Sequence, residues 1–148
     1  MRRTTNTNGR RKNRPQFNLW GYLSMLQAYS LNEVVAAGNT IPLRNQTIKK
    51  GCTAELSGTG VIQLNRCGIY MVECDASSAT AATIQLYRDG VAMPQAQSTG
   101  TSPSFTTLVQ VTENNSDCCP CSAPVLLRLV SVTASTYTDV NAVVTKVV

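Results

Sequence analysis

The chain has 148 residues, enough for one domain with a substantial core, and hydrophobic residues make up 43% of it. Only 14% of the residues are charged and none is histidine, which excludes Ser-His-Asp and Cys-His catalytic relays and histidine metal ligands. The sequence has no run of 18 apolar residues, so it predicts no contact with a membrane through a spanning segment.

Positive charge is concentrated at the N-terminus. Residues 1–14 hold six of the 13 basic residues and no acid, which leaves seven basic and eight acidic residues in the rest of the chain. Such a hydrophilic stretch predicts a disordered, flexible arm over residues 1–16 that binds an acidic partner, either nucleic acid or an acidic protein surface. An inert, solvated tail is the alternative. The arm residues are Arg2, Arg3, Arg10, Arg11, Lys12 and Arg14.

Residues 17–30 follow the arm and contain Phe17, Trp20 and Tyr22. These side chains are too aromatic for a solvated linker, so we expect a docking segment or a strand that leads into the domain. No uninterrupted apolar stretch precedes a small-residue cleavage site here, and a secretory signal peptide is not expected. The protein is therefore expected to be synthesised in a host cytoplasm without a signal peptide.

From about residue 31 onward, short apolar stretches alternate with turn residues. Asp89-Gly90 is a strong hairpin signal, because both residues tolerate positive φ. About eight to ten short strands at regular spacing predict an all-β sandwich or barrel of antiparallel strands over residues 31–148. Alternation within these strands places four large side chains in its core: Tyr70, Val72, Ile84 and Leu86.

Six cysteines are present, three of them in the run Cys118-Cys119-Pro120-Cys121. Three thiols within four residues cannot easily surround one tetrahedral ion, and no second cysteine pair has metal-ligand spacing. Thiols or disulfides are favoured over a zinc or iron–sulfur site at Cys118, Cys119 and Cys121. Cys52, Cys67 and Cys74 are expected to be small buried hydrophobic residues.

Seven of the eight acidic residues fall in predicted turns or on outward strand positions: Glu55, Glu73, Asp75, Asp89, Glu113, Asp117 and Asp139. This placement favours solvated surface charge over paired catalytic carboxylates. The sequence also lacks a phosphate-binding glycine loop with a lysine partner. No enzymatic activity, cofactor or metal is therefore expected.

Five short motifs, taken together in their order along the chain, resemble those of the tumour-necrosis-factor-like jelly rolls. That family includes complement globular heads and phage virion and bacterial spore-surface proteins. The matching segments are residues 38–43 (GNTIPL), 61–64 (VIQL), 68–72 (GIYMV), 84–90 (IQLYRDG) and 142–148 (AVVTKVV). The resemblance implies an antiparallel jelly-roll sandwich that assembles as a homotrimer. The chain departs from secreted members in having an arginine-rich arm instead of a collagen-like stalk.

The closing segment, residues 140–148, is aliphatic on both faces of a predicted strand. Such a strand fits burial between the core of one subunit and a neighbouring subunit, and a core strand of a monomer is the alternative. We expect the trimer contact at Val140, Ala142, Val144 and Val148.

These features together suggest a non-enzymatic structural protein of a virus or phage particle. It would be a trimeric jelly roll in the virion, decorating or projecting from the capsid and anchored by its N-terminal segment. Its expected partners are itself, a capsid or other virion protein, and nucleic acid through the arm. The alternatives are a small capsid protein whose arm binds packaged nucleic acid, and a ligand-binding module of a bacterial surface or spore coat.

Overall fold

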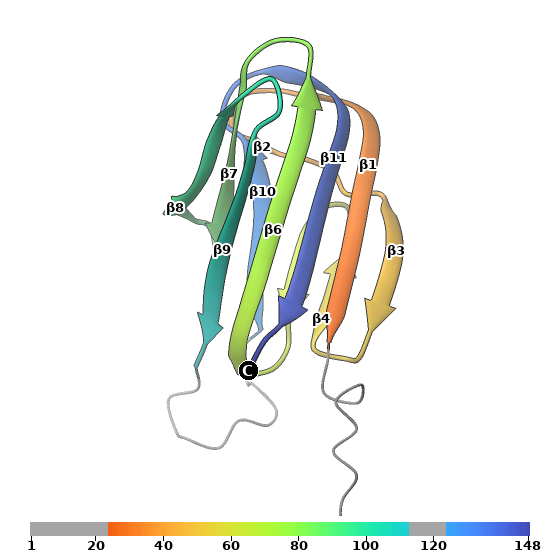
Figure 1. Cartoon of the computed structure of the whole chain (residues 1–148), viewed down its shortest axis with the longest axis vertical. Helices are drawn as coiled ribbons and strands as arrows, with labels where there is room; N and C mark the ends of the chain where they lie inside the picture. The colour runs from red at the N-terminus through yellow and green to blue at the C-terminus, as the bar shows by residue number, and fades with distance from the viewer. Residues whose placement is uncertain (1–23, 113–123) are drawn as a thin grey trace, which may run out of the picture.

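The computed structural model describes residues 24–112 and 124–148. Its two antiparallel sheets form a sandwich (Figure 1), which confirms the predicted all-β fold. The strands are β1 (Met25–Val35), β2 (Asn39–Thr40), β3 (Asn45–Lys50), β4 (Ala54–Ser57), β5 (Val61–Leu64), β6 (Gly68–Ser78), β7 (Ala82–Arg88), β8 (Val91–Gly100), β9 (Ser104–Val111), β10 (Val125–Ser131) and β11 (Ser135–Lys146). No helix in these two segments is long and apolar enough to cross a membrane.

Some expectations concern parts of the chain outside the described residues. They are the arm over residues 1–16, the aromatic residues Phe17, Trp20 and Tyr22, and the thiols of Cys118, Cys119 and Cys121. These remain predictions from the sequence.

One sheet has the strand order β3-β1-β11-β6-β9. The other has the order β4-β5-β10-β7-β8, with the short strand β2 paired with β10. The last strand of the chain, β11, therefore lies in the middle of the five-stranded sheet, hydrogen-bonded to β1 on one side and β6 on the other. This pairing joins residues that are far apart in the chain.

The strands differ from expectation in number and in where the first one begins. The described residues form eleven strands rather than eight to ten. One of them, the edge strand β3, is exposed at every residue and so lacks the apolar alternation that marks a buried strand.

The first strand, β1, starts at Met25. Residues 25–30 thus belong to the first strand, and the sandwich begins before residue 31. The reason is that Leu26, Ala28 and Ser30 alternate into the core.

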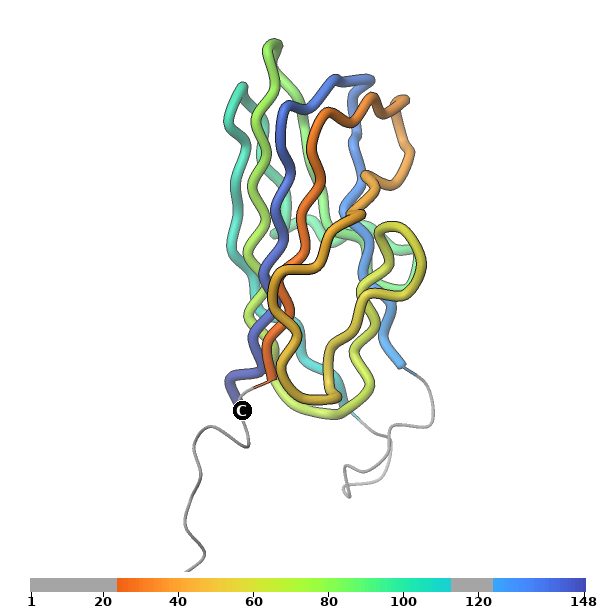
Figure 2. Tube along the Cα trace, turned by 90° about the vertical axis from the view of Figure 1, so that its right-hand side faces the viewer, coloured from red at the N-terminus to blue at the C-terminus, as the bar shows by residue number. Residues whose placement is uncertain are grey.

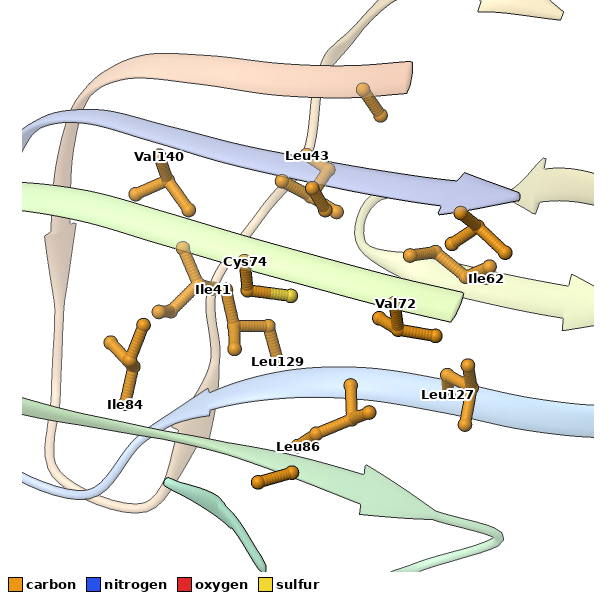
Figure 3. Close-up of a cluster of buried hydrophobic side chains, with 14 of the residues drawn as sticks. Ile41, Leu43, Ile62, Val72, Cys74, Ile84, Leu86, Leu127, Leu129 and Val140 are labelled. Carbon is orange, nitrogen blue, oxygen red and sulfur yellow. The ribbon is translucent and has the colours of Figure 1, made fainter. Parts of the chain in front are cut away.

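The core lies between the inward faces of the two sheets. Tyr70, Val72, Ile84 and Leu86 are all fully buried there, and Figure 3 shows Val72, Ile84 and Leu86 within one cluster. The Tyr70 hydroxyl donates a hydrogen bond to the carbonyl oxygen of Arg66 at 2.7 Å. This bond satisfies the polar end of a buried ring, which would otherwise oppose its burial.

The β7–β8 hairpin turns at Asp89-Gly90, as the sequence predicts. Both residues have positive φ, 48° and 81°, the backbone that a two-residue hairpin turn requires. The Asp89 carboxylate also accepts a hydrogen bond from the backbone N–H of Leu126 at 2.9 Å. The turn residue therefore also links the hairpin to the neighbouring strand β10.

Every point where the described chain starts, breaks or stops lies at one end of the sandwich. Met25 pairs with Thr145, Gly68 pairs with Val111, and Val125 pairs with Leu64. The start of β1, the ends of β9 and β11 and the start of β10 therefore lie at the same end of the sandwich (Figures 1 and 2). We call this the basal end. The turns that follow β1, β6 and β10 form the opposite, distal end.

The cysteines divide differently from expectation. Cys67 and Cys74 are buried, but Cys52 is exposed, so the prediction that Cys52 is a buried hydrophobic residue is wrong. It lies in the bend that joins β3, an edge strand of one sheet, to β4, an edge strand of the other. Burial, together with the neighbouring charges of Asp75 and Glu73, raises the pKa of the Cys74 thiol.

This difference predicts the pattern of thiol modification. In the native protein, Cys52 should react rapidly with a thiol-specific reagent, whereas Cys74 should react only after unfolding because its thiol is buried and stays protonated. Peptide mapping by mass spectrometry after timed labelling measures both sites in one sample. Equal rates at the two sites in the folded protein would contradict the placement of Cys74 in the core.

Candidate functional site

Among the residues that the structure describes, one acidic residue is buried, and it forms an ion pair with Arg44. Glu33 accepts a hydrogen bond from the Ser30 hydroxyl at 2.7 Å and from the Arg44 guanidinium at 2.5 and 3.3 Å. The sequence does not reveal this pair, because Asn32 has a positive φ of 55°. This conformation changes the alternation, so that both Glu33 and Val35 are buried. The hydrogen bonds with Arg44 hold the pKa of Glu33 below its ordinary value, against the opposing effect of burial.

The direction of this pKa shift predicts a pH dependence. A carboxylate with a lowered folded-state pKa contributes stability above its ordinary pKa of 4.5, and that contribution disappears as the pH falls through the folded-state pKa. Replacing Glu33 by glutamine should therefore lower the Tm by a few degrees at pH 7, and this difference in Tm should shrink as the pH is lowered below 4.5. Thermal melts of both proteins over a series of pH values test this. A difference in Tm that does not change with pH would contradict it.

The outer face of the five-stranded sheet, which points away from the core, carries many apolar side chains. The register aligns Met25 with Thr145, Thr145 with Met71, and Met71 with Leu108 in one row across four strands. Leu108 is 60% exposed. We call the apolar residues that β1, β6, β9 and β11 place on this face the apolar patch: Met25, Tyr29, Leu31, Ile69, Met71, Leu108 and Val143.

The outer face of the other sheet is more polar. Arg128 of β10 lies beside Tyr87 of β7, and Thr83 and Thr99 join their hydroxyls at 2.7 Å across the β7–β8 pair. Glu55, Gln63, Gln85 and Gln97 occupy further outward positions on this sheet, and Val61, Leu126 and Val130 lie among them. Of the large apolar residues that are exposed, Val91 lies on this sheet, whereas Leu31, Ile48 and Leu108 lie on the five-stranded sheet. Contiguous exposed apolar surface marks contact sites more often than isolated apolar residues do. The five-stranded sheet is therefore the better candidate for a contact with another protein.

Three residues expected at a trimer contact face the interior of their own subunit. Val140, Ala142 and Val144 are at most 1% exposed in the single chain, so a second subunit cannot touch their side chains. Their neighbours Asn141, Val143 and Thr145 are partly exposed on the outer face. Val148, the fourth expected residue, is exposed at the basal end. The strand β11 does reach the outer face, but through the opposite set of alternating residues.

Three carboxylates lie on the same outer face, nearer the distal end than the row of Met25. Glu73 and Asp75 follow one another on the outward side of β6, and Asp139 lies on β11, opposite Ser77. We call these three residues the acidic stripe. Burial and the charges of Asp139 and Glu73 raise the pKa of Asp75, partly offset by a hydrogen bond with Asn141.

A shallow hollow of about 420 Å³ lies beside the acidic stripe. Its lining includes Glu73 and Asp75 of β6, Ser104 and Thr106 of β9, and Asn141 and Val143 of β11. Gln27 of β1 donates a long hydrogen bond of 3.4 Å to the Asn141 side chain. The hollow therefore presents carboxylates surrounded by neutral hydrogen-bonding groups, which suits a cationic group. In the part of the chain that the structure describes, no three potential ligand side chains group closely enough to hold a metal ion.

A second hollow, of about 500 Å³, lies at the distal end. It is lined mainly by small apolar and hydroxyl side chains, among them Val34, Ala36, Ala79, Ala134 and Thr136. No charged residue lines it. This hollow is a second concave surface that could accept a ligand.

Comparisons with solved structures establish the type of fold. The globular domain of zebrafish complement 1qA matches with a TM-score of 0.61 at 9% identity, over 84% of this chain and 96% of that chain. Murine APRIL matches with a TM-score of 0.59 at 10% identity, over 84% and 99%. The PRD1 vertex protein P5 matches with a TM-score of 0.60 at 11% identity, over 84% and 97%.

At such low identities these similarities concern the fold alone. No protein-family model matches the chain, and no curated protein matches it significantly. The fold is a jelly roll of the tumour-necrosis-factor and complement-globular-head type, which also occurs in a phage protein. The resemblance inferred from the sequence motifs is confirmed at the level of the fold.

Proposed function

We propose that this protein is a non-enzymatic structural component of a virus or phage particle. In this proposal it forms a homotrimer that decorates or projects from the capsid, and its N-terminal segment anchors it there. The observation that carries the proposal is the apolar patch on the outer face of an otherwise complete sandwich. The similarity in fold to the PRD1 vertex protein P5 supports the assignment to a particle.

Self-association through the outer face follows from its composition. Leu31 and Leu108 are more than half exposed, and Met71 and Val143 lie between them on the central strands. Covering such a surface removes apolar area from water, at roughly 25 cal/mol per Å². Closed symmetric homo-oligomers are the commonest soluble assemblies. A second and third copy of the same chain are therefore the partners we propose for this face.

The placement of the chain ends supports the proposed anchoring. The described part of the chain begins at Ser24, next to Met25 at the basal end. The basic segment that precedes it therefore joins the sandwich at this end, and the turns of the distal end lie at the opposite side (Figure 2). A subunit held through residues 1–16 would present its distal end away from the attachment point.

A ligand-binding module of a bacterial surface or spore coat is the second candidate. The distal hollow beside Val34 and Ala134 is the observation that favours it. The ligand-binding module and the particle protein would both be trimers, but only the ligand-binding module requires a ligand at the distal end. The small capsid protein, whose arm would bind packaged nucleic acid, differs from both in retaining nucleic acid.

Native mass measurement tests the proposal directly. The wild-type protein should have the mass of three subunits at micromolar concentration, before and after nuclease treatment. Leu108→Asp, on the outer face, should yield folded monomers, because the charge must remain hydrated. The matched control is Val91→Asp, a residue that is 69% exposed at the start of β8 in the other sheet, and this variant should remain trimeric.

Two results would overturn this proposal. A wild-type mass of one subunit would remove the trimer, and a trimeric Leu108→Asp variant would remove the outer face as the contact. A loss of mass after nuclease treatment would favour the small capsid protein that binds nucleic acid.

A further inference from the structure

We propose that the acidic stripe of Glu73, Asp75 and Asp139 is the docking site of the chain's own basic N-terminal arm, residues 1–16. In the assembled trimer the arm would come from a subunit of the same assembly. This inference rests on the proposed function, because the acidic stripe lies on the face that we assign to the subunit contact. The arm–stripe contact itself can be tested without the trimer.

The charges of the acidic stripe have no cationic partner among the described residues. The ion pairs found there join Arg44 to Glu33 and Lys49 to Glu55, and neither includes a residue of the acidic stripe. Residues two apart on a strand are separated by about 7 Å, and diagonal neighbours on adjacent strands by about 7–8 Å. Asp75 therefore lies within one screening length, about 8–10 Å, of both Glu73 and Asp139 and is repelled by each of them.

Residues that lie directly opposite one another on neighbouring strands form rows across the sheet. In the described residues, no lysine or arginine lies in a row that contains a residue of the acidic stripe. The row of Glu73 contains Ile48, Gln27, Val143 and Thr106. The row of Asp75 contains Asn45, Tyr29, Asn141 and Ser104. That of Asp139 contains Leu31 and Ser77.

Association through the outer face would make this repulsion more costly. A second subunit over the apolar patch would displace water from Glu73, which lies directly opposite Val143. Removing a carboxylate from water is costly unless a cation and hydrogen bonds replace the lost hydration. The outer face thus combines an apolar patch that favours association with a charge that opposes it. A cationic segment is the missing element.

The N-terminal arm has the required chemistry. It contains six cations and no acid, and five of the six are arginines. A guanidinium group binds a carboxylate through two parallel hydrogen bonds, which a lysine ammonium cannot do. The hollow beside Asp75 adds Ser104, Thr106 and Asn141 as neutral hydrogen-bonding neighbours, so it could hold the end of one arginine side chain.

The arm is also long enough to reach the acidic stripe. The row of Asp75 includes Tyr29, five residues along β1 from Ser24, or about 17 Å. Arg14 precedes Ser24 by ten residues, which can span up to about 33 Å when extended. The arms of the same subunit and of a neighbouring subunit both begin at the basal end and satisfy this requirement.

The experiment uses the full chain with all six arm cations replaced by glutamine. Sedimentation at low salt should show that this variant assembles at least tenfold more weakly than the wild type. Adding Glu73→Gln and Asp75→Asn to it should restore assembly, because the repulsion is removed. The matched control adds Glu55→Gln and Asp89→Asn, one glutamate and one aspartate of the other sheet, and should restore nothing.

A second measurement separates this inference from the proposed function. A fluorescently labelled peptide of residues 1–16 is added to the glutamine-arm variant, and its anisotropy is followed at low and high salt. Binding should be weakened at least tenfold by Glu73→Gln with Asp75→Asn, and much less by the control pair. If the wild-type protein is monomeric but the peptide binds in this pattern, the trimer fails and the arm–stripe contact holds.

The opposite results would overturn the inference while leaving the trimer intact. They are a glutamine-arm variant that assembles as tightly as the wild type, or a peptide that binds equally well after the acidic stripe is neutralised. An arm that binds added nucleic acid but not the glutamine-arm protein would have the same consequence.

Discussion

Val144→Asp is expected to unfold the subunit, whereas Val143→Asp is expected to leave it folded and to prevent assembly. Val144 is fully buried between the sheets, where an unpaired carboxylate costs several kcal/mol, comparable to the whole stability of a domain. Val143, its neighbour on β11, is partly exposed on the outer face. Circular dichroism melts and sedimentation of both variants measure folding and assembly separately.

The Val143→Asp variant carries a small additional cost in the monomer. Its new carboxylate would lie opposite Glu73, and like charges in directly opposed positions destabilise a sheet by up to about 1 kcal/mol. That is too little to unfold the protein. A folded Val144→Asp protein would show that this side chain is not in the core, and a trimeric Val143→Asp protein would show that β11 is not part of the contact.

Gly60→Ala is expected to be the most damaging single glycine substitution outside the basal end. Gly60 has φ of +103°, and a Cβ atom there would lie 2.7 Å from the carbonyl oxygen of Ile41. That carbonyl cannot easily move, because the Ile41 N–H is hydrogen-bonded to Leu129 at 2.8 Å and the Ile41 side chain is fully buried. Backbone strain and displacement together should cost about 3 kcal/mol or more.

Gly58→Ala is the matched control in the same turn between β4 and β5. Gly58 also has a positive φ, of +64°, but no atom lies within 4 Å of the position of its Cβ. Alanine there pays the conformational cost alone, about 1–2 kcal/mol. Urea denaturation of the two variants measures the difference. Equal losses would mean that the approach of Ile41 to Gly60 does not constrain the turn.

Much of the fold could be predicted because strands leave a local pattern. Alternation in β6 and β7 placed Tyr70, Val72, Ile84 and Leu86 on common faces, and these residues are buried. Asp89-Gly90 identified a hairpin for the same local reason, since few residue pairs tolerate its backbone. Edge elements carry a weaker pattern. The exposed strand β3 has no alternation of apolar residues, and no local pattern separates the exposed Cys52, in the adjoining bend, from a buried cysteine.

The sequence by itself determined the strand-rich fold, its core side chains in the central strands, and the separation of a basic arm from a nearly neutral body. Only the tertiary structure decided which face of β11 lies inside. The period of two groups Val140, Ala142 and Val144 together and sets Val143 apart, but it does not say which group faces the core when both are aliphatic. Pairing with the distant strands β1 and β6 decides that. The same pairing, between residues far apart in the chain, brings Asp139 beside Asp75 and creates the acidic stripe.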